Sequence, residues 1–145
     1  MLDAQFDYVY KRNNYFEVIK NEKYGFADLN GNVKIAPLYD HIGLEYDNYG
    51  VAAAEREGKY GLVSFETFTE VLEPSYDYIG FCNSQTDLLD VRKNGKKGLF
   101  SLKKMKEVTP CIYDYISYEG AFYIVKKGKK RGYLNLDGSI NEPLE

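Results

Sequence analysis

An internal repeat constrains this chain most, because three kinds of marker recur in the same order four times. An aromatic residue followed by aspartate stands at Phe6-Asp7, Tyr39-Asp40, Tyr76-Asp77 and Tyr113-Asp114. A glycine recurs at Gly25, Gly61, Gly98 and Gly132, and a proline at Pro37, Pro74, Pro110 and Pro143. Such a fixed period is typical of repeat architectures. The markers divide the chain into units 6–38, 39–75, 76–112 and 113–145, which we interpret as one repeat domain spanning 1–145.

Inside each unit apolar residues alternate with polar ones, which indicates β-strands. Just before a turn, an apolar pair recurs at Phe16/Val18, Ala52/Ala54, Leu89/Val91 and Phe122/Ile124. After the turn, a second strand begins at the repeated glycine and has a small polar residue at its fourth position. These polar residues are Asp28, Ser64, Ser101 and Asn135. The pattern predicts a hairpin in every unit, with the small polar side chain facing away from its apolar neighbours.

Turn residues separate the predicted strands. The first turns are Asn21-Glu22-Lys23, Glu57-Gly58-Lys59, Asn94-Gly95-Lys96 and Lys127-Gly128-Lys129. Glycine supplies the positive φ that tight hairpins require. A short third strand is then predicted to stop at the proline, which cannot donate to a ladder. Its ranges are 33–35, 70–72, 106–108 and 139–141, and a further short strand follows each aromatic-Asp pair.

These elements predict an all-β protein of four tandem antiparallel β-meander repeats, each of about 33–37 residues. One unit cannot bury its apolar face alone, so neighbouring units must pack on each other. We expect the units to stack as an open twisted array. The alternative is a closed, propeller-like ring, for which the repeat length is also suitable.

Composition excludes several classes of function. The net charge of −3 disfavours non-specific nucleic-acid binding, which needs a positive field. No apolar run approaches the roughly 20 residues of a membrane helix, and no secretory signal is visible, so we expect a cytoplasmic protein. Cys82 and Cys111 form no Cys/His cluster, and no copy has the spacing of a calcium loop. We therefore predict no metal and no cofactor.

The unit resembles the WG-containing repeat, a short bacterial β-rich repeat with the order Gly-Lys, Trp-Gly, apolar-apolar-polar, Gly, strand, Pro, Tyr-Asp. The stretches that carry the resemblance are Lys23 to Val33, Gly58 to Val63, Lys97 to Phe100 and Arg131 to Gly138. The position of the signature Trp holds Tyr24, Tyr60, Lys97 and Arg131. The resemblance covers nearly the whole chain, and it implies repeats that present an interaction surface and no general catalytic activity.

Residues suited to catalysis are few and scattered. His41 is the only histidine, and it stands at a repeat position where Tyr78 and Tyr115 follow their own aromatic-Asp pairs. A Cys/His dyad of His41 with Cys82 or Cys111 is conceivable, but both cysteines stand at ordinary repeat positions. We therefore predict no catalytic residue and no enzyme. The repeated aspartates allow two interpretations. Each caps a turn by accepting backbone N–H groups two residues on, or together they form a ring of acids that binds cations.

Tyrosines and lysines are the candidate binding residues. Tyr46, Tyr49, Tyr118 and Tyr123 fall where the copies differ most, and tyrosine suits interfaces. Lys96, Lys97, Lys129 and Lys130 belong to two basic turns that we expect on one side of the molecule, as a patch for an acidic partner. The sequence thus predicts a non-enzymatic protein-interaction module. The alternative is a small-ligand or glycan binder that uses exposed tyrosines between repeats.

Overall fold

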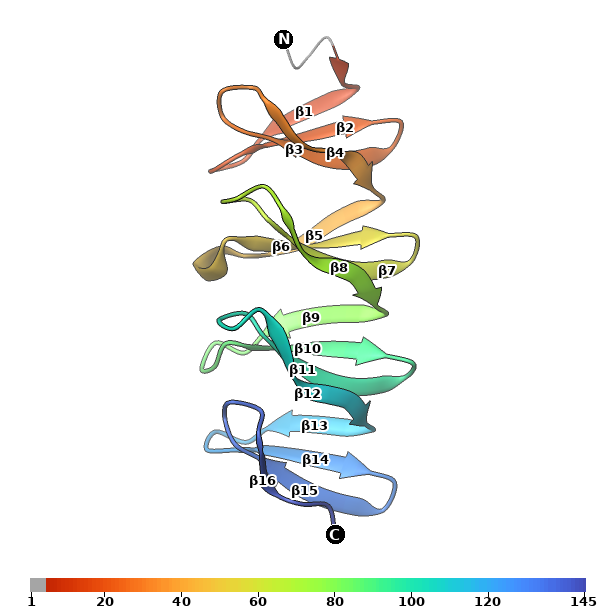
Figure 1. Ribbon diagram of the computed structural model, residues 1–145, viewed down its shortest axis with the longest axis vertical. Coiled ribbons are helices and arrows are strands. Elements are labelled where there is room, and N and C mark those ends of the chain that lie inside the picture. Colours follow the sequence, from red (N-terminus) through yellow and green to blue (C-terminus); the bar gives the residue numbers. More distant parts are fainter. Residues whose placement is uncertain (1–4) are drawn as a thin grey trace. The chain divides into compact units, whose positions relative to one another are not determined.

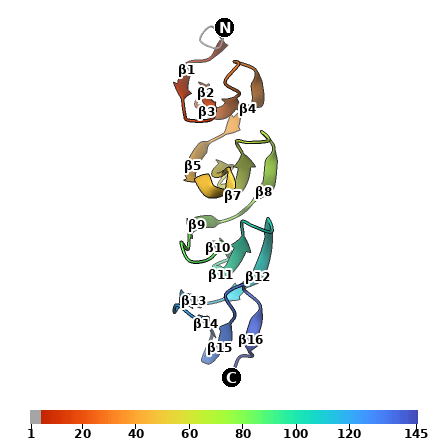
Figure 2. The same ribbon diagram turned by 90° about the vertical axis from the view of Figure 1, so that its left-hand side faces the viewer.

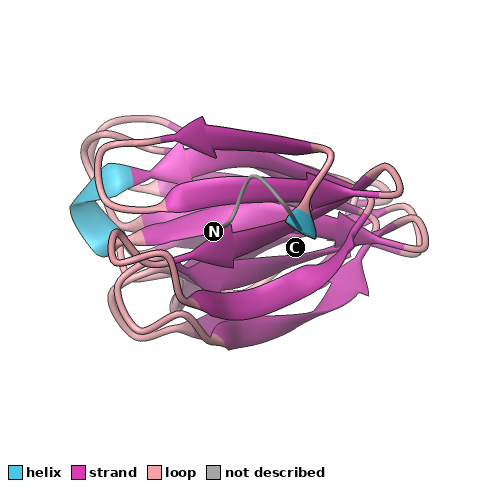
Figure 3. Cartoon of the chain, turned by 90° about the horizontal axis from the view of Figure 1, so that it is seen from above, coloured by secondary structure: helices cyan, strands magenta, loops and turns pink. Residues whose placement is uncertain are grey.

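The computed structural model describes residues 5–145, and strands are the main secondary structure among them (Figures 1 and 3). The predicted all-β fold of four meander repeats is therefore confirmed. The chain forms two compact units that divide between Ser75 and Tyr76, where the second and third predicted repeats meet. Among the described residues, no helix is long and apolar enough to cross a membrane.

The first unit holds two antiparallel sheets of four strands each, in which chain order equals strand order. Sheet one consists of β1 (Tyr8–Lys11), β2 (Phe16–Lys20), β3 (Lys23–Ala27) and β4 (Val33–Tyr39). Sheet two consists of β5 (His41–Tyr46), β6 (Val51–Arg56), β7 (Lys59–Ser64) and β8 (Glu70–Tyr76), with the short 3-10 helix η1 (Asp47–Tyr49) after β5. The Ala-rich segment of β6 is a strand, as its register predicts.

The second unit repeats this arrangement. Sheet three consists of β9 (Tyr78–Cys82), β10 (Leu88–Lys93), β11 (Lys96–Ser101) and β12 (Lys106–Tyr113). Sheet four consists of β13 (Tyr115–Tyr118), β14 (Tyr123–Lys127), β15 (Lys130–Leu134) and β16 (Ile140–Glu142). The meander of each sheet is visible from the side in Figure 2.

Each unit has its own apolar core between its two sheets. In the first unit Tyr15 and Phe26 of sheet one pack with Ala52, Val63 and other residues of sheet two. In the second unit the core residues are Leu88, Leu99, Tyr113, Tyr123, Val125 and Leu134. Neighbouring repeats therefore stack face to face within a unit, as the repeat pattern predicts.

The turn glycine of the fourth repeat shifts one predicted strand by a residue. In the first three hairpins both turn residues have positive φ, for example Asn94 at 54° and Gly95 at 77°. The fourth turn is Gly128-Lys129, with the positive φ at its first residue, Gly128. Two-residue hairpin turns occur with positive φ at both residues or at the first residue only. The second kind of turn favours glycine at its first residue.

The predicted apolar pair Phe122/Ile124 is therefore wrong. Strand pairing aligns Tyr123 with Leu134 and Val125 with Gly132. Tyr123 and Val125 are 3% and 2% exposed, whereas Phe122 and Ile124 are only half-buried. Aligning Gly128 with Gly58 and Gly95 caused the error, because a slip of one residue turns every side chain to the other face.

The repeated glycines lie on the third strand of each sheet, for example on β3 and β11. They allow the fourth strand, which leads into the proline, to lie close to the third. A β-carbon on Gly98 would lie 2.5 Å from the Thr109 carbonyl oxygen and 2.9 Å from the Cys111 nitrogen. On Gly25 it would lie 2.7 Å from the Ala36 carbonyl carbon. Real side chains never approach backbone so closely, and this explains why glycine recurs at this position in all four copies.

The prediction that the third strand stops at the proline is wrong in the first three sheets. β4, β8 and β12 continue through the proline to the aromatic residue. These strands lie at the edges of their sheets, where a residue without an N–H is tolerated. In β4 and β12 the pairing register also shifts around the proline, so no ladder bond is required there.

The small polar residues fix the loop that leads into the third strand. The Asp28 carboxylate accepts the N–H groups of Asn30 and Asn32 at 3.0 and 2.9 Å. The Ser64 hydroxyl accepts the N–H groups of Glu66 and Thr67 at 3.2 and 3.0 Å. These side chains compete with the ladder for backbone donors, and so they end the strand.

Candidate functional site

The repeated aspartate closes the hairpin of its own sheet. One carboxylate oxygen of Asp7, Asp40, Asp77 and Asp114 accepts the N–H of the first turn residue, at 2.7–2.8 Å. We interpreted this aspartate as a cap that binds backbone N–H groups two residues on, and that position is wrong. The aspartate does cap a turn, but the turn lies 14 to 17 residues further along the chain. No group of three metal-ligating side chains occurs among the described residues.

Two of these aspartates also hold the preceding repeat. Lys23 forms an ion pair with Asp40, and Lys96 forms one with Asp114. Hydrogen bonds to Lys23 and to the Glu57 N–H lower the pKa of Asp40. The Lys96 side chain, which sequence analysis placed in a binding patch, is thus engaged within the second unit.

The other predicted basic residues lie near the same edge of the second unit. Lys97 is half-buried, with its ammonium 5.9 Å from the centre of the Tyr115 ring. Lys129 and Lys130 are exposed at the β14–β15 turn. The β10–β11 and β14–β15 turns point the same way in Figure 1, as expected for a common basic patch. Three of the four lysines therefore remain candidates for contact with a partner.

The predicted tyrosines divide into two groups, one in each unit. Tyr46 on β5 and Tyr123 on β14 are buried, at 8% and 3% exposure, so the expectation of exposed rings is wrong for these two. The Tyr123 side chain belongs to the core between sheets three and four. Tyr49 in η1 and Tyr118 on β13 are half-buried. The Tyr118 and Tyr123 rings meet edge to face with centres 5.5 Å apart.

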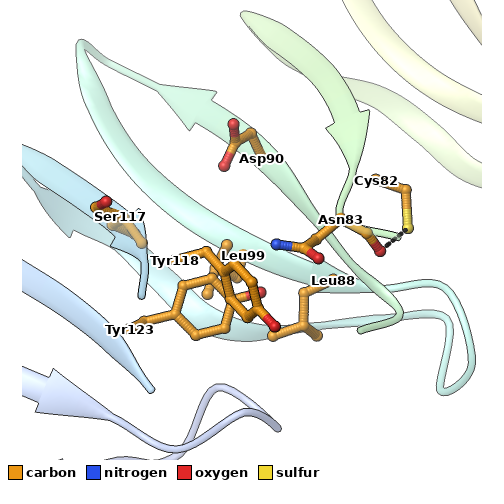
Figure 4. A pocket seen from close by; sticks show the side chains of 9 residues that line it. Cys82, Asn83, Leu88, Asp90, Leu99, Ser117, Tyr118 and Tyr123 are labelled. Carbon is orange, nitrogen blue, oxygen red and sulfur yellow. Dashed lines mark hydrogen bonds between the residues drawn. The ribbon is translucent and has the colours of Figure 1, made fainter. Parts of the chain in front are cut away.

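Tyr118 and Tyr123 form one wall of a hollow of about 330 Å³ in the second unit (Figure 4). Sheet three contributes a carboxylate, an amide and a thiol, and sheet four contributes a hydroxyl beside the rings. The lining residues are Cys82, Asn83, Leu88, Asp90, Leu99, Ile116, Ser117, Tyr118 and Tyr123. An apolar pocket with a few polar groups is typical of small-molecule sites.

The titratable groups of the hollow suit binding better than nucleophilic chemistry. Burial raises the pKa of the Cys82 thiol, and its Sγ donates to the Asn83 carbonyl oxygen at 3.6 Å. Packing also raises the pKa of Asp90, against the opposing effect of Lys97 and Arg92, although solvent still reaches this side chain. The Tyr123 hydroxyl lies 3.0 Å from that of Thr86. Cys82 is therefore a neutral thiol near pH 7 and a poor nucleophile.

A row of exposed residues was missed by sequence reasoning. The residue directly after each aromatic-Asp pair opens the first strand of its sheet and is exposed in all four copies. We call these residues the exposed row: Tyr8, His41, Tyr78 and Tyr115. They share one register position, and an aromatic ring after each aromatic-Asp pair was the signal that could have revealed them.

In the second unit the exposed row is paired with cations. The Arg92 guanidinium lies 4.8 Å from the centre of the Tyr78 ring, and the Lys126 ammonium lies 4.9 Å from that of Tyr115. Both are directly opposite their tyrosine in the strand pairing. These contacts produce an exposed surface of flat rings and positive charge on one unit.

In the first unit the surroundings of the exposed row are acidic. Tyr8 and Tyr10 lie parallel on β1, with ring centres 6.3 Å apart, and border a broad, open hollow of about 780 Å³. Asp7, Glu22 and Asp40 line the same hollow. The His41 ring packs edge to face on Tyr24, which occupies the position of the signature Trp. The two units therefore present the same row with different charge.

Comparison with known proteins supports the repeat assignment. Residues 24–60 and 103–130 match the family model of the WG containing repeat, so the predicted resemblance is confirmed over these two segments. No curated protein sequence matches the chain. A repeat-based binding module is the class of protein that this match and the fold indicate.

Two solved structures match this chain at very low sequence identity. One is "Kluyveromyces lactis Hsv2 complete loop 6CD", with a TM-score of 0.45 and 7% identity over 91% of this chain. The other is "Crystal Structure of the N-terminal Domain of Nup159", with a TM-score of 0.40 and 9% identity over 97% of this chain. This chain spans 45% and 42% of those chains, respectively.

Proposed function

We propose that this chain is a non-enzymatic protein-interaction module that binds an acidic protein surface through its second unit. The observation that carries the proposal is the pairing of exposed rings with cations at Tyr78 and Tyr115. Tyrosine and arginine are enriched at protein interfaces because they combine contact area with polar groups. The exposed lysines of the β14–β15 turn extend the positive surface.

Electrostatic complementarity supplies the specificity in this proposal. Positive charge on one surface speeds encounter with an acidic partner and disfavours basic ones. The rings supply apolar contact area that does not depend on salt. The proposed complex therefore weakens with rising ionic strength and does not vanish.

Affinity capture with matched variants tests the proposal. The wild-type chain and a variant with Lys97, Lys129 and Lys130 changed to Glu serve as baits in extracts of the native cell. Lys96 stays unchanged because it holds Asp114. The matched control changes Lys103, Lys104 and Lys106 to Glu, which are exposed lysines of the same unit. The proposal requires a stoichiometric protein that the wild type and the control retain and the first variant loses.

A second bait separates the rings from the charges. Changing Tyr78 and Tyr115 to Ser removes the rings and keeps every lysine and arginine. We expect loss of the same partner. A partner that both the charge variant and the ring variant still retain would place the interface elsewhere and refute the proposed surface.

Small-ligand binding is the second candidate function, and the hollow beside Tyr118 is the observation that favours it. A thermal-shift panel of glycans, nucleotides and small organic ions tests it with the full chain. A ligand of this hollow raises the melting temperature of the wild type, and the effect diminishes in Tyr118→Ala.

A further inference from the structure

The hollow of the second unit lies at a position that side chains fill in the first unit. Strand pairing makes Asp90 equivalent to Glu17, because they oppose Leu99 and Phe26, which directly follow the repeated glycines. The Asn83 N–H donates to the Leu88 carbonyl at 3.0 Å, as the Arg12 N–H donates to Tyr15 at 2.8 Å.

A guanidinium group neutralises the carboxylate in the first unit. Arg12 donates from Nε and Nη2 to one oxygen of Glu17, at 3.1 and 2.9 Å. Glu17 is 6% exposed, so this pair lies at the boundary of the core. The two opposite charges compensate each other. The hydrogen bonds to Glu17 raise the pKa of Arg12.

The second unit keeps the carboxylate and lacks the arginine. Asn83 stands in the position of Arg12, and two further replacements remove volume, since Leu88 and Leu99 stand where the first unit has Tyr15 and Phe26. Among the residues that the structure describes, none forms an ion pair or hydrogen bond with the Asp90 side chain. Lys97 and Arg92 act on its charge from a distance only.

We propose that this hollow binds the guanidinium group of a ligand, with Asp90 as its counter-ion and the rings of Tyr118 and Tyr123 beside it. Figure 4 shows Asp90, Asn83 and the two rings around the same space. A guanidinium suits this setting because it pairs with carboxylates through two N–H groups and stacks on aromatic faces. The NH2 group of Asn83 provides donors for the rest of the ligand, while the Asn83 oxygen accepts the Gln85 N–H and the Ser117 hydroxyl donates to Glu119.

The environment of Asp90 agrees with a cationic ligand. Partial burial disfavours the ionised carboxylate of Asp90 and raises its pKa, although solvent reaches the side chain, so a cation placed beside it stabilises the charged form. Among the described residues that line the hollow, Asp90 is the one carboxylate, and a divalent metal would prefer more than one. The inference rests on the small-ligand function and does not require the exposed row or the lysine surface to bind a partner.

Titration of the full chain with L-arginine amide, followed by NMR or calorimetry, tests the proposal. Citrulline amide is the control ligand, because it has nearly the same shape without the charge. We expect arginine amide to bind and citrulline amide not to bind. Asp90→Asn should weaken binding about tenfold or more, as expected for a hydrogen bond to a charged group. Glu142→Gln, which changes an exposed carboxylate of the same unit outside the hollow, should leave binding unchanged.

A second variant tests the equivalence of the two units directly. Asn83→Arg should supply the missing guanidinium from the chain itself, prevent arginine amide from binding, and raise the melting temperature. Equal binding of the two amides, or binding that ignores Asp90→Asn and Asn83→Arg, would overturn the proposal, and so would an absence of binding by arginine amide.

The same titration distinguishes a free guanidino compound from an arginine side chain of a partner protein as the ligand. Agmatine represents free guanidino compounds, and a short peptide with one central arginine represents a protein ligand. Tighter binding of agmatine assigns the hollow to a free small molecule, and tighter binding of the peptide assigns it to an arginine of a partner. A glycan that binds regardless of Asp90 would preserve the small-ligand function and remove the guanidinium from it.

Discussion

The carboxylate of Asp114 accepts the backbone N–H of Gly128 at 2.7 Å, and so the start of sheet four closes the far turn of its own second hairpin. The other carboxylate oxygen binds Lys96 of the preceding repeat. One side chain thus links a turn, a strand start and the neighbouring sheet. This structural role explains why aspartate recurs at this position.

Asp114→Ala should lower the melting temperature at pH 7, because it leaves a turn N–H and an ammonium without their partner. The hydrogen bonds from the Gly128 N–H and Lys96 lower the pKa of Asp114 below its usual range. A lowered folded-state pKa stabilises the protein above the unfolded pKa, and this contribution is lost as the pH falls through the folded pKa. The difference between variant and wild type should therefore narrow below about pH 4.

Thermal unfolding of both proteins across pH 7 to pH 2.5 measures this effect. Glu142→Ala, which removes an exposed carboxylate of the same sheet, is the control and should change the melting temperature little at any pH. A constant difference between Asp114→Ala and wild type throughout the acid range would contradict the assigned role.

Gly98→Ala should destabilise the second unit by about 1–3 kcal/mol, the usual cost of forcing an extra carbon into packed structure. The added carbon would meet the Thr109 carbonyl oxygen at 2.5 Å, and backbone cannot move as a side chain can. Gly43→Ala is the matched control, since its added carbon would meet only the His41 ring at 3.5 Å. Urea unfolding compares the two variants, and equal stability would disprove the close-approach explanation for the repeated glycine.

Val125→Thr should cost about 1–3 kcal/mol, because it places a hydroxyl without a partner in the core between sheets three and four. Ile124→Thr should cost less, since Ile124 is half-buried on the opposite face. Denaturant unfolding measures both, and the two substitutions leave β-propensity nearly unchanged. A larger loss of stability for Ile124→Thr than for Val125→Thr would support the register that places Phe122 and Ile124 in the core.

The sequence predicts the strands well and the surface poorly, for different physical reasons. Repeated glycines and alternating apolar residues reflect backbone and core geometry that every copy must satisfy, so they can be read by comparing copies. The predicted register of the fourth repeat is wrong because Gly128 was aligned with Gly95 as the turn glycine. Gly128 stands four residues before Gly132, whereas Gly95 stands three residues before Gly98.

The candidate sites depend on which residues meet between sheets, and spacing along the chain does not contain that information. Tyr123 was expected at the surface, but its register turns it into the layer between two sheets. The sequence pattern does not distinguish Asp90 from the other acidic residues of the chain. It becomes notable only beside Glu17, whose arginine partner has no counterpart in the second unit.

The two cysteines should react slowly with iodoacetamide at pH 7.5, which tests the proposed absence of nucleophilic catalysis. Burial raises the pKa of both thiols, and that of Cys111 to about 11, where the Glu107 carboxylate adds to the effect. A raised pKa keeps the thiol protonated at neutral pH, and only the thiolate attacks. Alkylation of Cys82→Ser, in which Cys111 is the remaining cysteine, should be far slower than that of N-acetylcysteine. Its rate should still be rising at pH 10. A rate that levels off below pH 8 would reveal an activated thiolate and reopen the question of a cysteine nucleophile.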